Sequence, residues 1–119
     1  MTPNLDDLYQ ILRAWAAQRT CKTYSDLSIA YQSRTGDRFE PHGSWDVPLG
    51  ELNRRLHSAL GAPAISALVV KKDTKEPGGG FWGCATNVPP RPTSADARLA
   101  AWAKVLNDVH AYPWPPTYP

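Results

Sequence analysis

The stretch SALVVKKDTKEPGGGFWG, residues 66–83, decides how this chain is interpreted. Its apolar, β-branched beginning predicts a short buried strand over residues 64–72. Residues 73–80 have the composition of a turn, in which three consecutive glycines allow positive φ angles that other residues adopt only at a cost. Phe81 and Trp82 then begin a returning strand. We therefore predict a β-hairpin with lysines along it.

Helical spacing of apolar residues predicts three helices before this hairpin and one after it, over residues 2–19, 23–36, 46–61 and 94–110. Residues suited to helix ends mark these boundaries. The first helix has Thr2 as cap and Pro3 in its first turn, the second has a Thr23–Asp26 capping box, the third has Asp46 as cap, and Gly36 and Gly61 end the second and third.

The order helix, helix, helix, strand, turn, strand, helix is typical of a winged helix-turn-helix. We therefore predict an α+β, mainly helical fold with a short β-hairpin wing and a C-terminal helix. A length of 119 residues suits one domain, 1–119. Its predicted parts are the N-terminal helix (1–22), a winged-helix-like core (23–83), the C-terminal helix (94–110) and a Pro- and aromatic-rich tail (111–119).

Two irregular segments carry large aromatic residues. The loop 37–46 contains Trp45, which we expect to fill the edge of the core, and also Phe39 and His42. Prolines prevent the tail from being helical. We expect it to lie across the body in polyproline-like form, with Tyr112 and Trp114 as anchors.

Composition limits the function classes. The chain is 42% hydrophobic and 20% charged, so it can bury a core, and its net charge of +2 is low for a dedicated nucleic-acid binder. The sequence shows no signal-peptide pattern and no apolar run near the roughly 18 residues of a membrane span. We therefore expect a cytoplasmic protein with reduced thiols and no membrane partner.

The first functional hypothesis is a non-enzymatic module that binds double-stranded DNA. In a winged helix-turn-helix the second helix enters the major groove and the hairpin touches the backbone. Here these elements are the helix 47–60 and the hairpin 71–82. Arg54 is expected to read base edges and Arg55 to reach a flanking phosphate. The candidate nucleic-acid-binding residues are Asn53, Arg54, Arg55, His57, Ser58, Lys71, Lys72 and Lys75.

The alternative is a protein-interaction module, such as an immunity, anti-defence or adaptor protein. Five Trp, five Tyr and a Pro-rich tail motivate it, because Trp and Tyr are favoured interface anchors. This hypothesis requires exposed tryptophans.

Catalysis is not expected. No nucleophile, base and orienting group can be placed together, and Cys21 and Cys84 have no assignable base. Neither a cofactor nor a metal site is predicted, since PGGGF lacks the phosphate-loop pattern and the three histidines lack ligand spacing.

Four short motifs resemble the DNA-binding domain of O6-alkylguanine alkyltransferases and alkyltransferase-like proteins, over about residues 23–83. They are Thr23-Tyr24-Ser25-Asp26-Leu27, Leu49-Gly50, Ser66-Ala67-Leu68-Val69-Val70 and Gly78-Gly79-Gly80-Phe81. The resemblance implies a winged-helix scaffold that binds DNA. Ser66 stands where that family has its reactive cysteine, and Val47 falls on its arginine finger. Alkyl transfer is therefore not expected.

A second resemblance is to a group of small bacterial and phage domains without an assigned activity. They carry an A-L-V-V-x-K-x-T-x-x-P-G-x-G-F signature, which residues 67–81 match, and an aromatic-rich end. The signature describes a strand and a turn, so it implies a fold more than a function.

Overall fold

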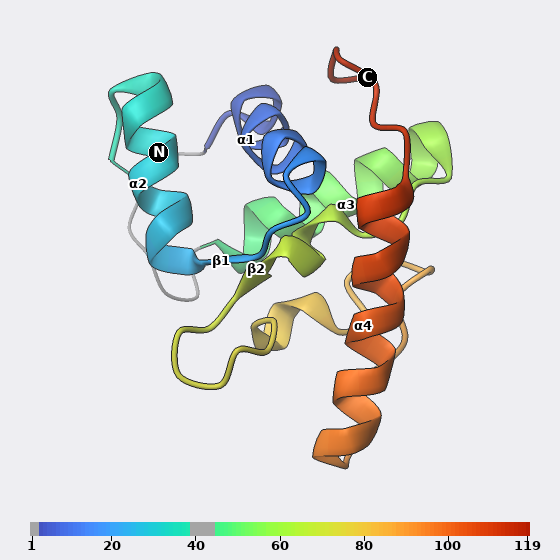
Figure 1. Cartoon of the computed structure of the whole chain (residues 1–119). Helices are drawn as coiled ribbons and strands as arrows, with labels where there is room; N and C mark the ends of the chain where they lie inside the picture. The colour runs from blue at the N-terminus through green and yellow to red at the C-terminus, as the bar shows by residue number, and fades with distance from the viewer. Residues whose placement is uncertain (1–2, 39–44) are drawn as a thin grey trace.

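The computed structural model of the chain describes residues 3–38 and 45–119 (Figure 1). Within these ranges the chain forms four α-helices, two short strands and two 3₁₀ helices, so the fold is mixed and mostly helical, as predicted. In chain order the elements are α1 (Leu5–Ala17), β1 (Lys22–Thr23), α2 (Tyr24–Thr35), α3 (Asp46–Leu60), η1 (Ile65–Leu68), β2 (Val69–Val70), η2 (Gly79–Phe81) and α4 (Ala95–Ala111).

The predicted β-hairpin over residues 71–82 is wrong. β2 pairs with β1 instead, and the two strands run parallel, with Lys22 opposite Val69. The first part of the predicted strand is the buried 3₁₀ helix η1. Phe81, expected in a returning strand, lies in η2, which packs on α3 and leaves Phe81 only 4% exposed. Phe81 is therefore buried against α3 and does not lie in a strand paired with β2.

The residues between β2 and η2 form a loop below β2 (Figure 1). The Lys71 N–H donates to the Glu76 carbonyl (2.8 Å), and the Lys75 N–H donates to the Lys71 carbonyl (3.0 Å). Lys75 has a φ of 60°, which is unusual for a residue other than glycine. We call residues 71–76 the lysine turn.

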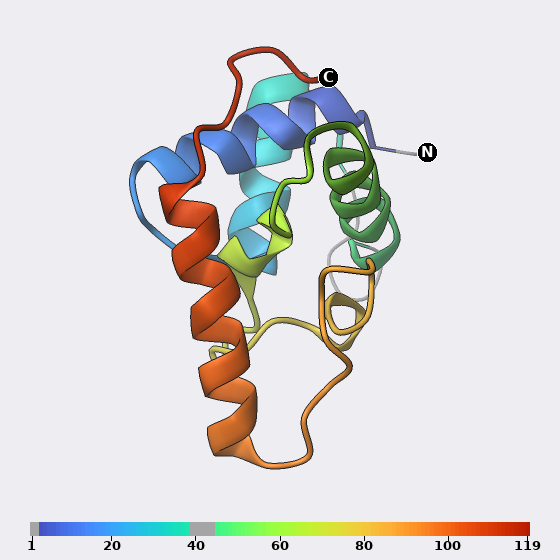
Figure 2. The same cartoon turned by 90° about the vertical axis from the view of Figure 1, so that its right-hand side faces the viewer.

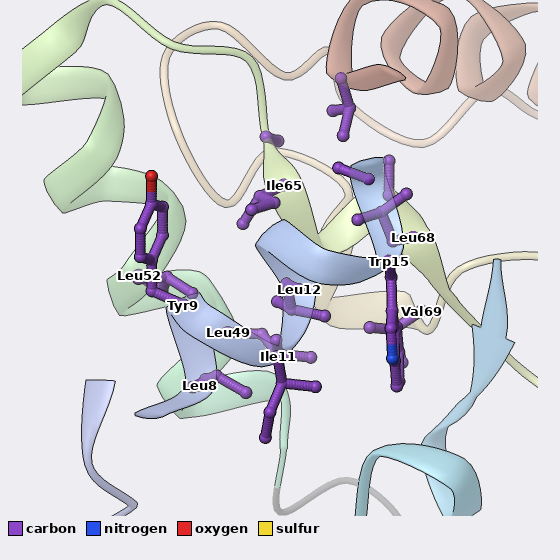
Figure 3. Packing of buried hydrophobic residues seen from close by; sticks show 14 of the residues in the cluster. Leu8, Tyr9, Ile11, Leu12, Trp15, Leu49, Leu52, Ile65, Leu68 and Val69 are labelled. Atoms are coloured by element: carbon purple, nitrogen blue, oxygen red, sulfur yellow. The ribbon is translucent and has the colours of Figure 1, made fainter. Parts of the chain in front are cut away.

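The core is built around η1 and β2. Every residue from Ile65 to Val70 is buried, and Figure 3 shows side chains of α1 and α3 gathered around this segment. The apolar stripes predicted for the first and third helices are therefore confirmed on their buried faces. Their buried members are Leu8, Leu12 and Trp15 of α1 and Leu49, Leu52 and Leu56 of α3.

Three of the predicted helix ends are confirmed. The Thr23 N–H donates to Asp26 Oδ2 (3.0 Å), and the Asp26 N–H donates to Thr23 Oγ1 (3.1 Å), which is the predicted capping box of α2. Gly36 and Gly61 end α2 and α3 in the left-handed conformation, with φ of 82° and 67°.

Two helix starts differ from the prediction. α1 begins at Leu5 and is capped by Asn4, whereas the predicted cap, Thr2, lies outside the described residues. Asp46 is the first residue of α3 rather than its cap, and Trp45 before it makes no side-chain cap. A Trp side chain cannot cap a helix start, because its indole N–H only donates, and that of Trp45 donates to Ser28 Oγ.

Trp45 fills the edge of the core, as predicted. It is fully buried, its indole N–H donates to Ser28 Oγ (2.9 Å), and its ring meets Tyr31 edge to face at 5.6 Å. The loop predicted over 37–46 is described only in part, because Phe39 and His42 lie outside the described residues.

The tail crosses α1, as predicted (Figure 2). The Tyr9 hydroxyl donates to the Pro115 carbonyl, and Gln10 Nε2 donates to the Pro116 carbonyl (2.9 Å). The indole N–H of Trp114 donates to the Val109 carbonyl of α4 (2.9 Å). The tail is therefore part of the packed body.

Candidate functional site

A cleft of about 740 Å³ lies where the first turn of α2, the start of α3 and the lysine turn meet. We call it the lysine cleft. It brings together segments that are distant in the sequence, because β1, just before α2, pairs with β2, just before the lysine turn. Its lining residues are Thr23, Tyr24, Ser25, Asp46, Lys71, Lys72, Asp73, Gly78 and Gly79.

The glycine triplet closes one side of this cleft by close approach, not by positive φ as predicted. The Gly78 N–H donates to the Tyr24 hydroxyl (2.8 Å). A Cβ atom at Gly78 would lie 2.4 Å from that hydroxyl, and one at Gly80 would lie 2.7 Å from Asp46 Cβ. Nothing lies within 4 Å of a Cβ at Gly79. Only the outer two glycines are therefore required by packing.

Tyr24 is a structural hydrogen-bond partner in the cleft. Its pKa is raised to about 12, mainly because the phenol is buried; the nearby Asp46 carboxylate adds to the rise, and the Gly78 N–H opposes it. The phenol is therefore neutral at physiological pH, and it is poorly suited to act as a base.

The three predicted wing lysines remain near one another although the wing does not exist. Lys71 and Lys72 line the cleft, and Lys75 lies in the same turn. All three are exposed, and no carboxylate of the described residues lies within 4.0 Å of their ammonium groups. Asp46 and Asp73 also line the cleft, so its formal charge is balanced.

Asn53 does not face solvent, and its assignment to a DNA-binding surface is wrong. It is 1% exposed. Its Nδ2 donates to Ser66 Oγ (2.6 Å) and to Cys84 Sγ (3.3 Å), and its Oδ1 accepts from the Ser66 N–H (3.2 Å). Helical spacing contained this signal, because Asn53 is four residues after Leu49 and therefore on the buried face.

Arg54 and Arg55 are both exposed, but their side chains bond to different partners. Arg54 Nη1 donates to the Cys84 carbonyl (3.1 Å), and the guanidinium lies back over Gly50. Arg54 therefore does not project from α3 as expected for a residue that reads bases. Arg55 pairs with Glu51 at 2.9 Å, and their side chains are 61% and 40% exposed.

Ser58 and His57 complete the predicted residues on α3. Ser58 is exposed. His57 faces a separate cleft beside α4, and its Nδ1 is buried without a hydrogen-bond partner in the described structure. The structure therefore leaves Arg55, Ser58 and the lysine turn as the candidates with open access to a ligand.

Cys21, Cys84 and Ser66 are not placed as activated nucleophiles. Burial raises the pKa of Cys21 and of Cys84, so both thiols are protonated at neutral pH. Ser66 is buried and bonded to Asn53. Among residues 3–38 and 45–119, no three His, Cys, Asp or Glu side chains cluster as metal ligands.

No tryptophan of the chain is exposed, although the protein-interaction hypothesis required several to be. Trp15 and Trp45 are buried, and Trp82, Trp102 and Trp114 are partly buried. The Trp102 indole N–H donates to the Ala67 carbonyl (2.9 Å), which fixes α4 to η1.

Comparison of the chain with protein-family models, with curated proteins and with solved structures gave no match. No helix in the described part of the chain combines the length and apolar character needed to cross a membrane.

Proposed function

We propose that the protein is a non-enzymatic module that binds double-stranded DNA through the lysine cleft and the solvent-facing side of α3. The observation that carries this proposal is the placement of Lys71 and Lys72. Both are exposed, both lack an ion-pair partner among the described residues, and both line a cleft at the N-terminal end of α2. Lysines are usual partners of backbone phosphate. The capping box at the start of α2 places the Asp26 carboxylate near Lys72, so the lysines and not the helix end carry this proposal.

The spacing of α3 supports the same proposal. Asp46 at its start lines the lysine cleft, and Arg55 follows nine residues later, which is about 14 Å along a helix axis. The DNA major groove is about 12 Å wide. The end of α3 at the lysine cleft and Arg55 are thus separated by about the width of a groove, so the two can contact phosphates on its two sides.

The lysine turn takes the place of a hairpin wing in this proposal. Asp46 and Asp73 oppose DNA binding by repelling phosphate, so modest affinity with strong salt dependence is expected. Catalysis is not proposed, because neither thiol is activated. The docked tail and the absence of exposed tryptophans weigh against the protein-interaction alternative.

Fluorescence anisotropy with a random-sequence duplex at several salt concentrations tests the proposal. Replacing Lys71 and Lys72 together by Gln should weaken binding and reduce the slope of log K against log salt by about two units, since each phosphate contact contributes about 0.9. Lys104→Gln on α4 is a single-charge control, because it removes one exposed positive charge away from the cleft, and it should leave the slope unchanged. Absence of salt-sensitive binding at low ionic strength would refute the proposal.

A further inference from the structure

A second cleft, also of about 740 Å³, lies between the C-terminal end of α3 and α4. We call it the α3–α4 cleft. Figure 2 shows these two helices on opposite sides of η1 and β2, with the chain segment that precedes α4 running from below α3 to the start of α4. The cleft shares no lining residue with the lysine cleft, so the DNA proposal leaves it unexplained.

The walls of the α3–α4 cleft are apolar and fixed by hydrogen bonds. Asn87 Nδ2 donates to the Ala62 carbonyl (2.9 Å), and the Tyr112 hydroxyl donates to the Leu60 carbonyl (3.3 Å). These bonds tie the loop and the tail to the end of α3. A preformed apolar cleft of this size suits a small molecule. Its apolar lining residues are Pro63, Ala64, Pro89, Ala101, Val105 and Pro113.

The electrostatics of the cleft favour a cation. Both flanking helices end there: Gly61, the C-cap of α3, and Ala111, the last residue of α4, line it. Helix C-termini carry partial negative charge. Asp108 adds a carboxylate, whose partner is Lys104 at 3.2 Å.

The ion pair between Lys104 and Asp108 is weak enough for another cation to replace the Lys104 ammonium. The side chains are 79% and 54% exposed, so water competes for both, and such pairs are weak. The other titratable groups in the lining are Tyr112, whose hydroxyl donates to the Leu60 carbonyl, and His57, whose Nδ1 is buried and lacks a partner in the described structure. A ligand cation can therefore replace the Lys104 ammonium at Asp108 while its apolar part occupies the cleft.

We infer that the α3–α4 cleft binds a small organic cation, an ammonium group carried on an apolar body. The ammonium group contacts Asp108 near the ends of the two helices. The apolar body lies against Val105, Ala101 and the prolines opposite them. This binding is independent of DNA binding, because the two clefts share no lining residue. The α3–α4 cleft lies at the negative ends of two helices, whereas the lysine cleft lies at the positive end of α2.

NMR titration of the ¹⁵N-labelled full chain tests this inference with two probes of the same shape. 2-Phenylethylammonium carries the cation, and 3-phenylpropionate carries a carboxylate on the same phenylethyl body. The cation should give saturable shifts of the Gly61, Ala101 and Val105 amides. The carboxylate should bind at least several times more weakly.

Three variants separate charge from shape. Asp108→Asn should weaken cation binding roughly two- to fivefold, the range of an exposed ion pair. Lys104→Gln should strengthen it by a similar factor, since the competing ammonium is removed. Ala101→Trp should abolish binding by filling the cleft, with the amide spectrum away from the cleft confirming an intact fold.

Several results would overturn the inference. These are no saturable shift with the cation, equal binding of the carboxylate or of neutral 3-phenylpropanol, and unchanged binding in Asp108→Asn or Ala101→Trp. Weaker binding in Lys104→Gln would also overturn it, because the ammonium of Lys104 would then assist the ligand.

Discussion

Gly78 and Gly80 show how single residues shape the lysine cleft. Each lies where a Cβ atom would overlap a neighbouring side chain, Tyr24 for Gly78 and Asp46 for Gly80. Gly79, between them, faces open space and has a negative φ. The triplet thus contains two positions that need glycine and one that does not.

Alanine substitutions in the triplet should therefore have opposite effects on the free energy of unfolding. Gly78→Ala and Gly80→Ala should each destabilise the protein by about 1–3 kcal/mol, as overpacking does. Gly79→Ala should leave stability unchanged or raise it by up to about 1 kcal/mol, because the unfolded chain loses freedom. Urea denaturation followed by tryptophan fluorescence measures all three.

A second substitution identifies the cause. Tyr24→Phe removes the hydroxyl that a Cβ at residue 78 would strike, so it should recover part of the loss in Gly78→Ala and none of the loss in Gly80→Ala. Equal destabilisation by all three alanines would contradict the close-approach explanation.

At the scale of single residues, helical spacing predicted which side chains are buried, whereas residue type alone was a poor guide to which side chains could contact DNA. The capping box at Thr23 and the stop at Gly61 followed from local chemistry, and both are confirmed. Asn53 was assigned to DNA by its chemical type although its position in the helix placed it inward. The fold-back of Arg54 onto the Cys84 carbonyl depends on a loop thirty residues away, and no local pattern indicates it.

At the scale of elements, Arg98 joins α4 to the lysine turn. Its Nε donates to Glu76 Oε1 (2.9 Å), and its Nη1 donates to the Pro92 (3.3 Å) and Thr93 (2.9 Å) carbonyls. The Arg98 and Glu76 side chains are 14% and 32% exposed, so this pair is better shielded from water than other ion pairs of the described residues. Arg98 thereby holds the turn that carries the lysines.

A double-mutant cycle on Arg98→Ala and Glu76→Ala should give a coupling free energy of about 1–2 kcal/mol, within the range for residues in one network. The Arg55–Glu51 cycle is the control and should give a much smaller coupling, because that pair is exposed and lies within one helix. Chemical denaturation measures both. Coupling no larger than in the control would show that Arg98 does not restrain the turn.

The hairpin predicted over residues 71–82 was wrong because of contacts between elements. Val69 and Val70 form a strand, as their side chains suggest, but a strand's partner is chosen by tertiary contacts. β1 has only two residues, Lys22 and Thr23, and no sequence pattern of that length predicts a strand. The cleft beside it was therefore beyond prediction, whereas the lysines that line it were identified.

For the whole molecule, the tail completes the packing of α1. The rings of Tyr9 and Trp114 lie 6.3 Å apart, and those of Tyr9 and Tyr118 lie 5.6 Å apart. Arg13 Nε also donates to the Trp114 carbonyl (3.4 Å). Figure 1 shows the tail at the opposite end of the molecule from the lysine turn, whereas Tyr118 of the tail lies beside Arg55 on α3. DNA contacts made by the lysine turn should therefore be independent of the tail.

Trp114→Ala should lower the free energy of unfolding by about 2–3 kcal/mol, somewhat less than the 3–5 kcal/mol of a fully buried Trp, because this side chain is only partly buried. It removes the indole N–H that bonds the Val109 carbonyl and the ring that meets Tyr9. Hydrogen exchange should quicken at the α1 amides while DNA affinity of the folded protein stays unchanged. Thr117→Ala, an exposed change in the same tail, should alter neither. Lower DNA affinity with unchanged stability in Trp114→Ala would instead place the tail in the binding surface.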